Sequence, residues 1–282
     1  MEEDDTNISM LFMEERSYFR QVHTYVLTEE DEKKPLFELM KSFPPEFMKQ
    51  PLFKAFSPKL SKLKINKENI TVDVAEKKLD QLKPGTYISN IEDTGNVERM
   101  LLSKYIEEGI QQGTTTVKDF ICNTWSQGHE FKYLSNVPVP DNMLDLAQVD
   151  LPWDFKDVGI EGDFEGINTP YLYVSTPGSV APWHLEDGNN RSFNAMFKAE
   201  TPKTAKIWFA VHKKYIPKVI EILQSLSYGD GTKPADKCPV FWRHKHHLVD
   251  MSIFTKHNIP VYKTIQYPGE IVITNSFHQV LY

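Results

Sequence analysis

The sequence predicts a mainly β protein with helical additions: a double-stranded β-helix of the jelly-roll kind, preceded by a helical N-terminal region. From about residue 165 onward, short β-branched or aromatic runs alternate with turn signals such as Thr176-Pro177-Gly178. Before about residue 125, apolar residues recur mainly at helical spacing. We therefore expect a mainly helical region at residues 1–125 and a β barrel at residues 126–282.

Composition excludes several classes of protein. The 282 residues carry a net charge of -7 and are 40% hydrophobic, which is typical of globular proteins and argues against a chain that coats nucleic acid. No apolar run reaches the roughly 18 residues that a membrane span needs, and the acidic start Met1–Asp5 is unlike a secretory signal. Two cysteines, Cys122 and Cys238, argue against a disulfide-built scaffold.

The helical expectation rests on two segments of the N-terminal region. One helix is expected from Asn96 as the N-cap to about Gly109, and a second from Thr115 or Thr116 to Gly128. Their apolar positions are Val97, Leu101, Tyr105 and Ile106, and then Val117, Phe120 and Ile121. Prolines favour a loop with short helical pieces at residues 43–58, and residues 62–78 are open between strand and linker.

The barrel strands are expected at four runs in the C-terminal half. These runs are Tyr171–Val174, Ala205–His212, His247–Met251 and Glu270–Asn275. One helix is expected to open at Pro217 and end at Gly229, and a short one to span Ser252–His257. Gly- and Pro-containing turns, among them Tyr267-Pro268-Gly269, separate the runs.

The sequence Trp183-His184-Leu185-Glu186-Asp187 carries the strongest chemical signal. On a strand, residues two apart project to the same face, so His184 and Glu186 point together. They supply two members of a 2-His-1-carboxylate triad, which suits non-haem Fe(II), and His278 is the candidate for the third. The alternative is a half-buried histidine beside a surface carboxylate.

Three further residues suit the binding of 2-oxoglutarate, the cosubstrate of many such iron enzymes. Lys206 offers a cation for its far carboxylate, while Asn194 and Tyr133 offer orienting polar groups. Lys206 shares a strand face with Trp208, whereas the rival Lys203 faces the opposite side. Without the metal motif, either lysine would be taken as a solvated surface charge.

These landmarks, taken in order, resemble a known family. Glu165–Tyr173, Trp183-His184-x-Glu186-Asp187, Ser192-x-Asn194, Lys206-x-Trp208-Phe209-Ala210, Phe241-x-Arg243-His244-Lys245 and Gly269–His278 resemble the JmjC domain of Fe(II)/2-oxoglutarate-dependent histone lysine demethylases. The resemblance covers about residues 130–282 and is nearest to the subgroup that carries a JmjN segment and acts on trimethyl-lysine. It implies a cupin-like JmjC barrel.

The resemblance also implies roles for individual residues. His184, Glu186 and His278 would hold iron, and Tyr133, Asn194 and Lys206 would hold 2-oxoglutarate. Gly166 and Tyr173 would line the methyl-ammonium pocket, with Tyr173 the candidate catalytic residue and Tyr171 on the same face.

Cys238 and His244 resemble half of this subgroup's structural zinc site. Either the chain is truncated before two further cysteines, the interpretation we favour, or zinc is absent and Cys238 is a packed side chain. By the resemblance, zinc would join Fe(II), 2-oxoglutarate and O2 as a cofactor if the full-length chain supplied two more ligands.

The expected activity is demethylation of N-methyl-lysine on histone tails by hydroxylation, with release of formaldehyde, in the nucleus and on chromatin. Residues 134–200 carry 3 Lys or Arg against 11 Asp or Glu, which favours a basic partner, although two solvated faces of opposite sign explain the counts equally well. No membrane and no sequence-specific nucleic-acid partner is expected.

Three departures from the family keep other interpretations open. The segment between Asn194 and Lys206 is about four residues longer, Gln279-Val280 replace small residues, and no JmjN segment is evident in residues 1–115. A JmjC protein hydroxylase and a JmjC-fold scaffold with a degenerate site are the alternatives. A zinc hydrolase on a similar barrel fits poorly, because Asn194 and Lys206 would lack a role.

Overall fold

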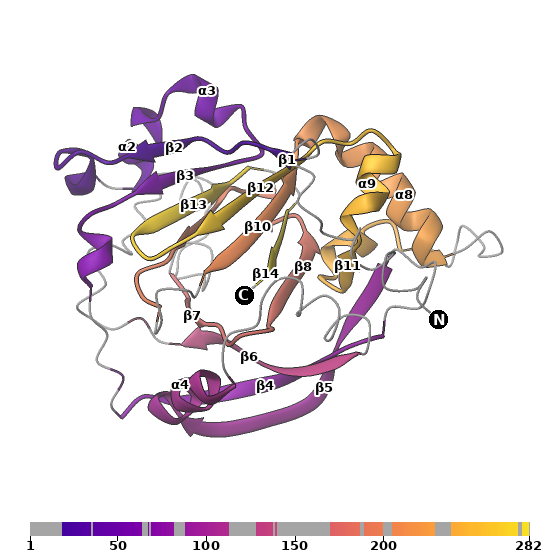
Figure 1. The fold of residues 1–282 in the computed structure, drawn as a ribbon, viewed down its shortest axis with the longest axis horizontal. Helices are drawn as coiled ribbons and strands as arrows, with labels where there is room; N and C mark the ends of the chain where they lie inside the picture. The colour runs from indigo at the N-terminus through magenta and orange to yellow at the C-terminus, as the bar shows by residue number, and fades with distance from the viewer. Residues whose placement is uncertain are drawn as a thin grey trace, which may run out of the picture.

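A computed structural model describes most of the chain between residues 19 and 281 (Figure 1). The described residues are 19–34, 36–63, 67, 69–81, 88–112, 128–137, 139, 170–186, 189–199, 205–228, 238–275 and 278–281. The expected helix at Thr115 or Thr116, the candidate Gly166 and the cysteine Cys122 lie outside these residues.

Three sheets organise the described residues. The first has the strand order β1-β12-β10-β14-β8, the second β11-β5-β4-β6-β7 and the third β2-β3-β13-β9. Their bounds are β1 Phe19–Arg20, β2 Thr24–Val26, β3 Leu52–Phe56, β4 Thr71–Leu79, β5 Ile88–Leu101, β6 His129–Val137, β7 Leu172–Val174, β8 Val180–His184, β9 Ser192–Ala195, β10 Lys206–Val211, β11 His247–Val249, β12 Val261–Gln266, β13 Glu270–Thr274 and β14 His278–Leu281.

The barrel is formed by curled antiparallel sheets. β10 pairs with β12 on one side and with β14 on the other, and β14 pairs with β8. Facing them, β13 pairs with β9. The fold is mainly β with the curvature of a jelly-roll half-barrel, so the predicted fold class is confirmed.

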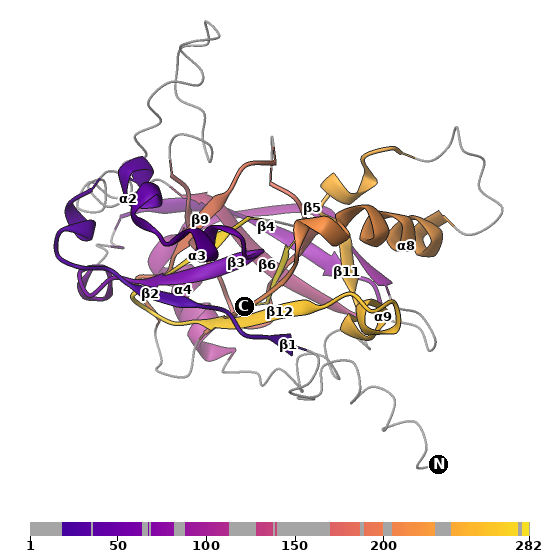
Figure 2. The same cartoon turned by 90° about the horizontal axis from the view of Figure 1, so that it is seen from above.

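Helices and N-terminal strands complete the barrel from outside. The short helices α2 (Leu36–Ser42) and α3 (Pro45–Met48) lie at one end of the molecule, and α8 (Ile216–Tyr228) and α9 (Met251–Lys256) at the other (Figures 1 and 2). Short 3-10 turns η1 (Asp31–Lys33), η2 (Leu60–Lys62), η6 (Lys213–Tyr215) and η8 (Phe241–Arg243) connect the elements.

The expectation of a mainly helical N-terminal region is corrected for the described residues. β1 pairs with β12 and β3 pairs with β13, so this region adds strands to the barrel sheets. β4 and β5 form a long hairpin below the barrel in Figure 1. These residues form strands because they pair with strands that are distant in the sequence. The local spacing of apolar residues cannot predict such pairing.

The helix predicted from Asn96 begins later, as α4 (Leu102–Gln111). Val97 and Leu101 belong to β5 and are 64% and 49% exposed. Val97 and Leu101 are four residues apart, a spacing that places two residues on one face of a helix but also on one face of a strand. Tyr105, the next apolar position, is fully buried on α4 as expected.

The four strands and two helices predicted after residue 165 are confirmed to within two residues at each end. The turn before β13 forms as its sequence predicts, with the Glu270 amide donating to the Tyr267 carbonyl over 3.0 Å. Gly269 has a φ of 90°, and a Cβ there would lie 2.9 Å from the Phe56 ring. Glycine is therefore required by both conformation and space.

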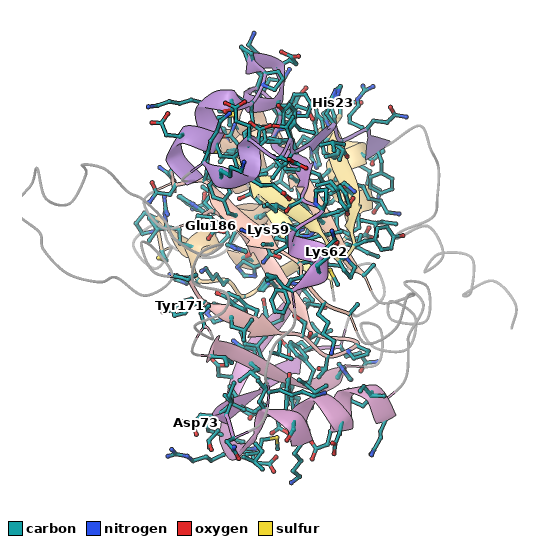
Figure 3. All side chains as sticks on the ribbon, turned by 90° about the vertical axis from the view of Figure 1, so that its left-hand side faces the viewer. His23, Lys59, Lys62, Asp73, Tyr171 and Glu186 are labelled. Carbon is teal, nitrogen blue, oxygen red and sulfur yellow. The ribbon has the colours of Figure 1, made fainter. Side chains whose placement is uncertain are left out.

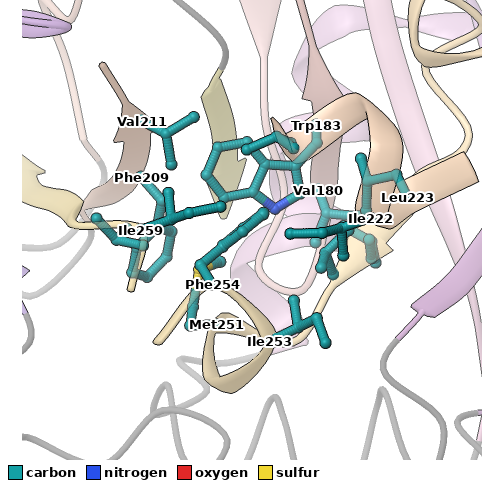
Figure 4. Close-up of a cluster of buried hydrophobic side chains, with 14 of the residues drawn as sticks. Val180, Trp183, Phe209, Val211, Ile222, Leu223, Met251, Ile253, Phe254 and Ile259 are labelled. Carbon is teal, nitrogen blue, oxygen red and sulfur yellow. The ribbon is translucent and has the colours of Figure 1, made fainter. Parts of the chain in front are cut away.

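The largest core cluster lies between the barrel and its helices (Figure 4). Trp183 of β8 is 1% exposed and packs edge-on against Phe254 of α9, with ring centroids 5.0 Å apart. Leu223 of α8 and Phe209 of β10 belong to the same cluster. Successive residues on a strand face opposite ways, so burial of Trp183 under the helices directs His184 into the barrel.

No helix among the described residues is long and apolar enough to span a membrane. The predicted domain boundary between residues 125 and 126 falls outside the described residues and stays a prediction.

Candidate functional site

His184 ends strand β8 and is 7% exposed. Its Nδ1 lies 2.6 Å from the carbonyl oxygen of Pro182. Because a carbonyl oxygen has no proton, Nδ1 must be the donor, and the neutral ring then keeps a lone pair on Nε2. Pro182 thus fixes both the tautomer and the direction of the ring.

The Nε2 atom of His184 faces the carboxylate of Glu186. The distance from Nε2 to Oε2 is 3.8 Å, and the Glu186 side chain is 24% exposed. This is too long for a hydrogen bond. Two electron-pair donors therefore converge at a spacing that suits a shared cation, as the His-x-Glu pattern predicts.

The third predicted ligand, His278, begins strand β14. Its Cα lies opposite that of His184 in the antiparallel ladder between β14 and β8, and opposite Ala210 in the ladder with β10. Directly opposed residues occupy one face of a sheet. The ladder is irregular after His278. The side chain of His278 lies outside the described part of the structure.

Lys206 is on the same face, because it lies four residues before Ala210 on β10. Its Nζ donates to Oδ1 of Asn194 on β9 over 3.2 Å, so the two residues predicted to bind a cosubstrate meet. The lysine is half-buried, and removal of the ammonium from water lowers its pKa to about 8.

Gln266 supports this pair and was not found from the sequence. It is fully buried on β12, accepts from Trp208 Nε1 over 2.8 Å and donates through Nε2 to the Asn194 carbonyl over 2.6 Å. Gln266 thereby joins the strands that carry Lys206 and Asn194. A single glutamine within Val261–Gln266 gives no local sign of this role.

Tyr133 on β6 approaches the site from the second sheet. Burial raises its pKa to about 12, and the charge of Glu186 contributes in the same direction. The pKa of Tyr173 on β7 is raised as well, first by desolvation and then by Tyr133 and Glu186. Both phenols therefore stay protonated at neutral pH and can donate hydrogen bonds.

Tyr173 also meets its predicted neighbour. The rings of Tyr171 and Tyr173 are edge-to-face with centroids 6.1 Å apart, which confirms that they share a face. Tyr173 remains 37% exposed. Figure 3 shows Glu186 at mid-height and Tyr171 below it, towards the sheet that carries Asp73.

Lys77 is another residue that the sequence did not reveal. Its Nζ lies 4.9 Å from the centroid of the Tyr133 ring, and it forms an ion pair with Asp93 at 3.1 Å. The ladder between β4 and β5 shifts between Ala75 and Lys77, and such a bulge redirects side chains. In the sequence, Glu76-Lys77-Lys78 looks like an ordinary solvated charge run.

Cys238 and His244, the predicted zinc half-site, are brought together. The Cys238 Sγ lies 3.4 Å from the His244 Nε2. The neighbouring histidines are used differently, since Nδ1 of His246 contacts the Ile91 carbonyl at 2.8 Å and Nδ1 of His247 contacts Asn90 Oδ1 at 3.0 Å. Burial, with help from His246 and His244, lowers the pKa of His247 to about 4.

The described side chains contain no group of three His, Cys, Asp or Glu residues arranged to hold a metal. His184 with Glu186 and Cys238 with His244 are each pairs of donors. Both pairs suit their expected metals chemically, imidazole with carboxylate for iron and thiolate with imidazole for zinc.

The C-terminal part of the chain matches a known protein family. Residues 171–282 match the family described as JmjC domain, hydroxylase. The mouse protein named Lysine-specific demethylase 4B is 34% identical over 110 residues, which is 39% of this chain and 9% of that protein.

Two further relatives match over the same length. The human Probable lysine-specific demethylase 4F is 32% identical and the rat Lysine-specific demethylase 4D is 31% identical, each over 110 residues and 39% of this chain. The match covers only 16% and 20% of these proteins, respectively. The resemblance to JmjC-domain lysine demethylases that the motifs predict is therefore confirmed for residues 171–282.

Proposed function

We propose that this protein is an Fe(II)- and 2-oxoglutarate-dependent dioxygenase that demethylates N-methyl-lysine on histone tails. The observation that carries the proposal is the His184–Glu186 pair, whose Nε2 and Oε2 atoms lie 3.8 Å apart, on the sheet face that also bears Lys206. A pair of metal-ligand side chains on the same face as a half-buried cation is the arrangement that an anionic, metal-chelating cosubstrate needs. The names of the relatives support the substrate class.

In this proposal, His184, Glu186 and His278 hold Fe(II), which supplies the oxidation of a methyl group by O2 when bound. Lys206 and Asn194 bind the far carboxylate of 2-oxoglutarate, and Tyr133 adds an O–H donor, because its pKa of about 12 keeps it protonated. Each turnover consumes the methylated lysine, O2 and 2-oxoglutarate. It yields the lysine with one methyl fewer, formaldehyde, succinate and CO2.

Tyr173 and Gly166 line the methyl-ammonium pocket in this proposal, with Tyr173 as the candidate catalytic residue. A neutral phenol offers its ring and its oxygen to a methylated cation without adding a charge. Cys238 and His244 contribute two ligands to a structural zinc site. The proposed location is the nucleus, with histone tails in chromatin as the partner.

Two measurements test the proposal. Fe(II) added anaerobically with 2-oxoglutarate should give a weak visible absorption band from the chelate, and its absence would contradict the dioxygenase function. Formaldehyde should be released from a trimethyl-lysine histone peptide, and His184→Ala should abolish the release. Arg99→Ala is the control, because Arg99 lies on β5 with a side chain 77% exposed.

The same experiment separates two alternatives. Succinate without formaldehyde would favour a JmjC protein hydroxylase, an activity that the family description itself names. Failure to bind Fe(II) by a folded protein would favour a JmjC-fold scaffold with a degenerate site.

A further inference from the structure

Arg243 reaches from η8 to the turn that follows Glu186. Its Nη1 donates to the Glu186 carbonyl oxygen over 3.3 Å, and its Nη2 donates to Oδ1 of Asn189 over 2.6 Å. The amide of Asn189 donates to the same Glu186 carbonyl over 3.0 Å. One guanidinium thus holds both the first and the last residue of the turn.

The last residue of this turn, Asn189, has an uncommon backbone conformation. Asn189 has a φ of 57°, in the left-handed region, which asparagine tolerates better than most residues. The two donors on the Glu186 carbonyl oxygen restrain the backbone of Glu186. A restrained backbone keeps the Cα–Cβ bond of Glu186 in one direction, and so limits the positions that its carboxylate can take near His184.

The backbone of Arg243 is anchored by the turn η8 and by the core next to it. Phe241, at the start of η8, is 2% exposed within the main core cluster, and the Arg243 amide donates to the Val240 carbonyl over 2.9 Å. Arginine suits the task, because its planar fork presents two donors in a fixed geometry that lysine lacks.

We propose that Arg243 is a positioning residue that holds Glu186 in the geometry required for metal binding. It does so from the segment that carries Cys238 and His244, so it links the two candidate metal sites of the chain. The inference rests on the proposed function only in taking His184 and Glu186 as metal ligands. Arg243 touches neither metal nor substrate and acts through the backbone of Glu186.

Co(II), a redox-stable probe, tests this inference by titration of the full chain. Loss of an outer hydrogen-bond partner of a ligand weakens metal binding by roughly 10–100-fold. We expect a rise of that size in the Kd for Arg243→Ala at unchanged stoichiometry, and a smaller rise for Arg243→Lys. The control Arg99→Ala should match the wild type.

Hydrogen exchange provides a readout that needs no metal. In the metal-free protein, the amides of Glu186, Asn189 and Asn190 should exchange faster in Arg243→Ala, while those of β13 stay unchanged. Asn189→Gly, which keeps the left-handed turn but removes the Oδ1 acceptor, should reproduce part of both effects if Arg243→Ala fails to fold.

The outcomes separate this inference from the proposed function. A wild-type protein that binds no Co(II) contradicts the metal site, whereas the exchange comparison still tests the contact made by Arg243. Wild-type Kd and exchange in Arg243→Ala would overturn the inference. A lower Co(II) stoichiometry of Arg243→Ala with an unchanged Kd would also overturn the inference. That result would mean that part of the protein is unfolded and that the folded part binds Co(II) normally, so the role of Arg243 would be purely structural.

Discussion

Lys206 is a half-buried cation whose pKa is lowered to about 8 because the protein removes it from water. Its Nζ donates to the neutral amide oxygen of Asn194 at 3.2 Å. An ammonium that has lost hydration is costly to keep charged, and an arriving carboxylate would offset that cost. Lys206 therefore has the chemistry of a cation that binds a carboxylate ligand.

This chemistry predicts how binding depends on pH. Only the protonated lysine attracts a carboxylate, so the affinity for 2-oxoglutarate should fall as the pH rises above about 8, by up to about tenfold per pH unit. Isothermal titration of the Mn(II)-loaded protein between pH 7 and 9 measures this, with the Mn(II) affinity at each pH as the control. Constant affinity over this range would contradict the role of Lys206.

Removal of the charge gives a complementary result. Lys206→Met keeps an unbranched side chain that is one heavy atom shorter and removes the ammonium, and hydrogen bonds to charged groups contribute about 1.5–3 kcal/mol. The affinity for 2-oxoglutarate should therefore fall by roughly 10–100-fold, and its decline above pH 8 should disappear.

At the scale of single elements, α9 shows how a cap can carry a buried charge. Asp250 is 4% exposed, and its Oδ1 accepts from the Ser252 amide over 2.7 Å at the start of the helix. Desolvation outweighs this bond and raises the pKa of Asp250 from 3.8 to about 6. The folded state therefore binds a proton on Asp250 more tightly than the unfolded state does.

The sign of the resulting pH dependence follows from linkage. Because the folded pKa is the higher one, the contribution of Asp250 to stability is present below about pH 4 and is lost as the pH rises to about 6. The loss is on the order of 3 kcal/mol at most. An asparagine in place of Asp250 would still cap the helix without a charge.

We therefore expect Asp250→Asn to be more stable than the wild type at pH 7, and this advantage to be smaller at pH 4.5. Urea unfolding at the two pH values measures the difference, and comparison between the two proteins cancels the titration of all other groups. If Asp250→Asn were less stable at both pH values, the Asp250 carboxylate would have to be stabilised by groups other than the Ser252 amide.

At the scale of the whole molecule, the strands before residue 125 are part of the barrel sheets. β3 pairs with β13 along five residues, and Lys54 of β3 forms an ion pair of 2.7 Å with Glu270 of β13. Their side chains are only 12% and 13% exposed. β4 and β5 extend the second sheet next to β6 and β11.

A fragment of residues 126–282 should therefore not fold by itself. It would leave β13, β12, β11 and β6 with unpaired edges, which favour aggregation. Circular dichroism during urea unfolding should show no cooperative transition for the fragment, in contrast to the full chain. A cooperative transition would instead support a domain boundary between residues 125 and 126.

Local patterns predicted much of the C-terminal half. Strands β7, β10, β11 and β13 and helices α8 and α9 follow from runs, turns and helical spacing, because these signals act over a few residues. The sequence also predicts as site residues the members of three pairs that are in contact or close together in the structure: His184–Glu186, Lys206–Asn194 and Cys238–His244. The order of the family motifs therefore indicates which side chains belong to one site, even where they lie on different strands.

The sequence by itself predicted the mainly β class and the resemblance to JmjC domains, and it supplied the site residues that are proposed here. Only the tertiary structure decided that residues 88–101 form a strand, that Gln266 joins Trp208 to Asn194, and that Arg243 holds the turn after Glu186. Each of these depends on partners dozens of residues away. Hydrogen bonds and strand pairs of this kind form only when the chain is folded, so no local pattern of side chains encodes them.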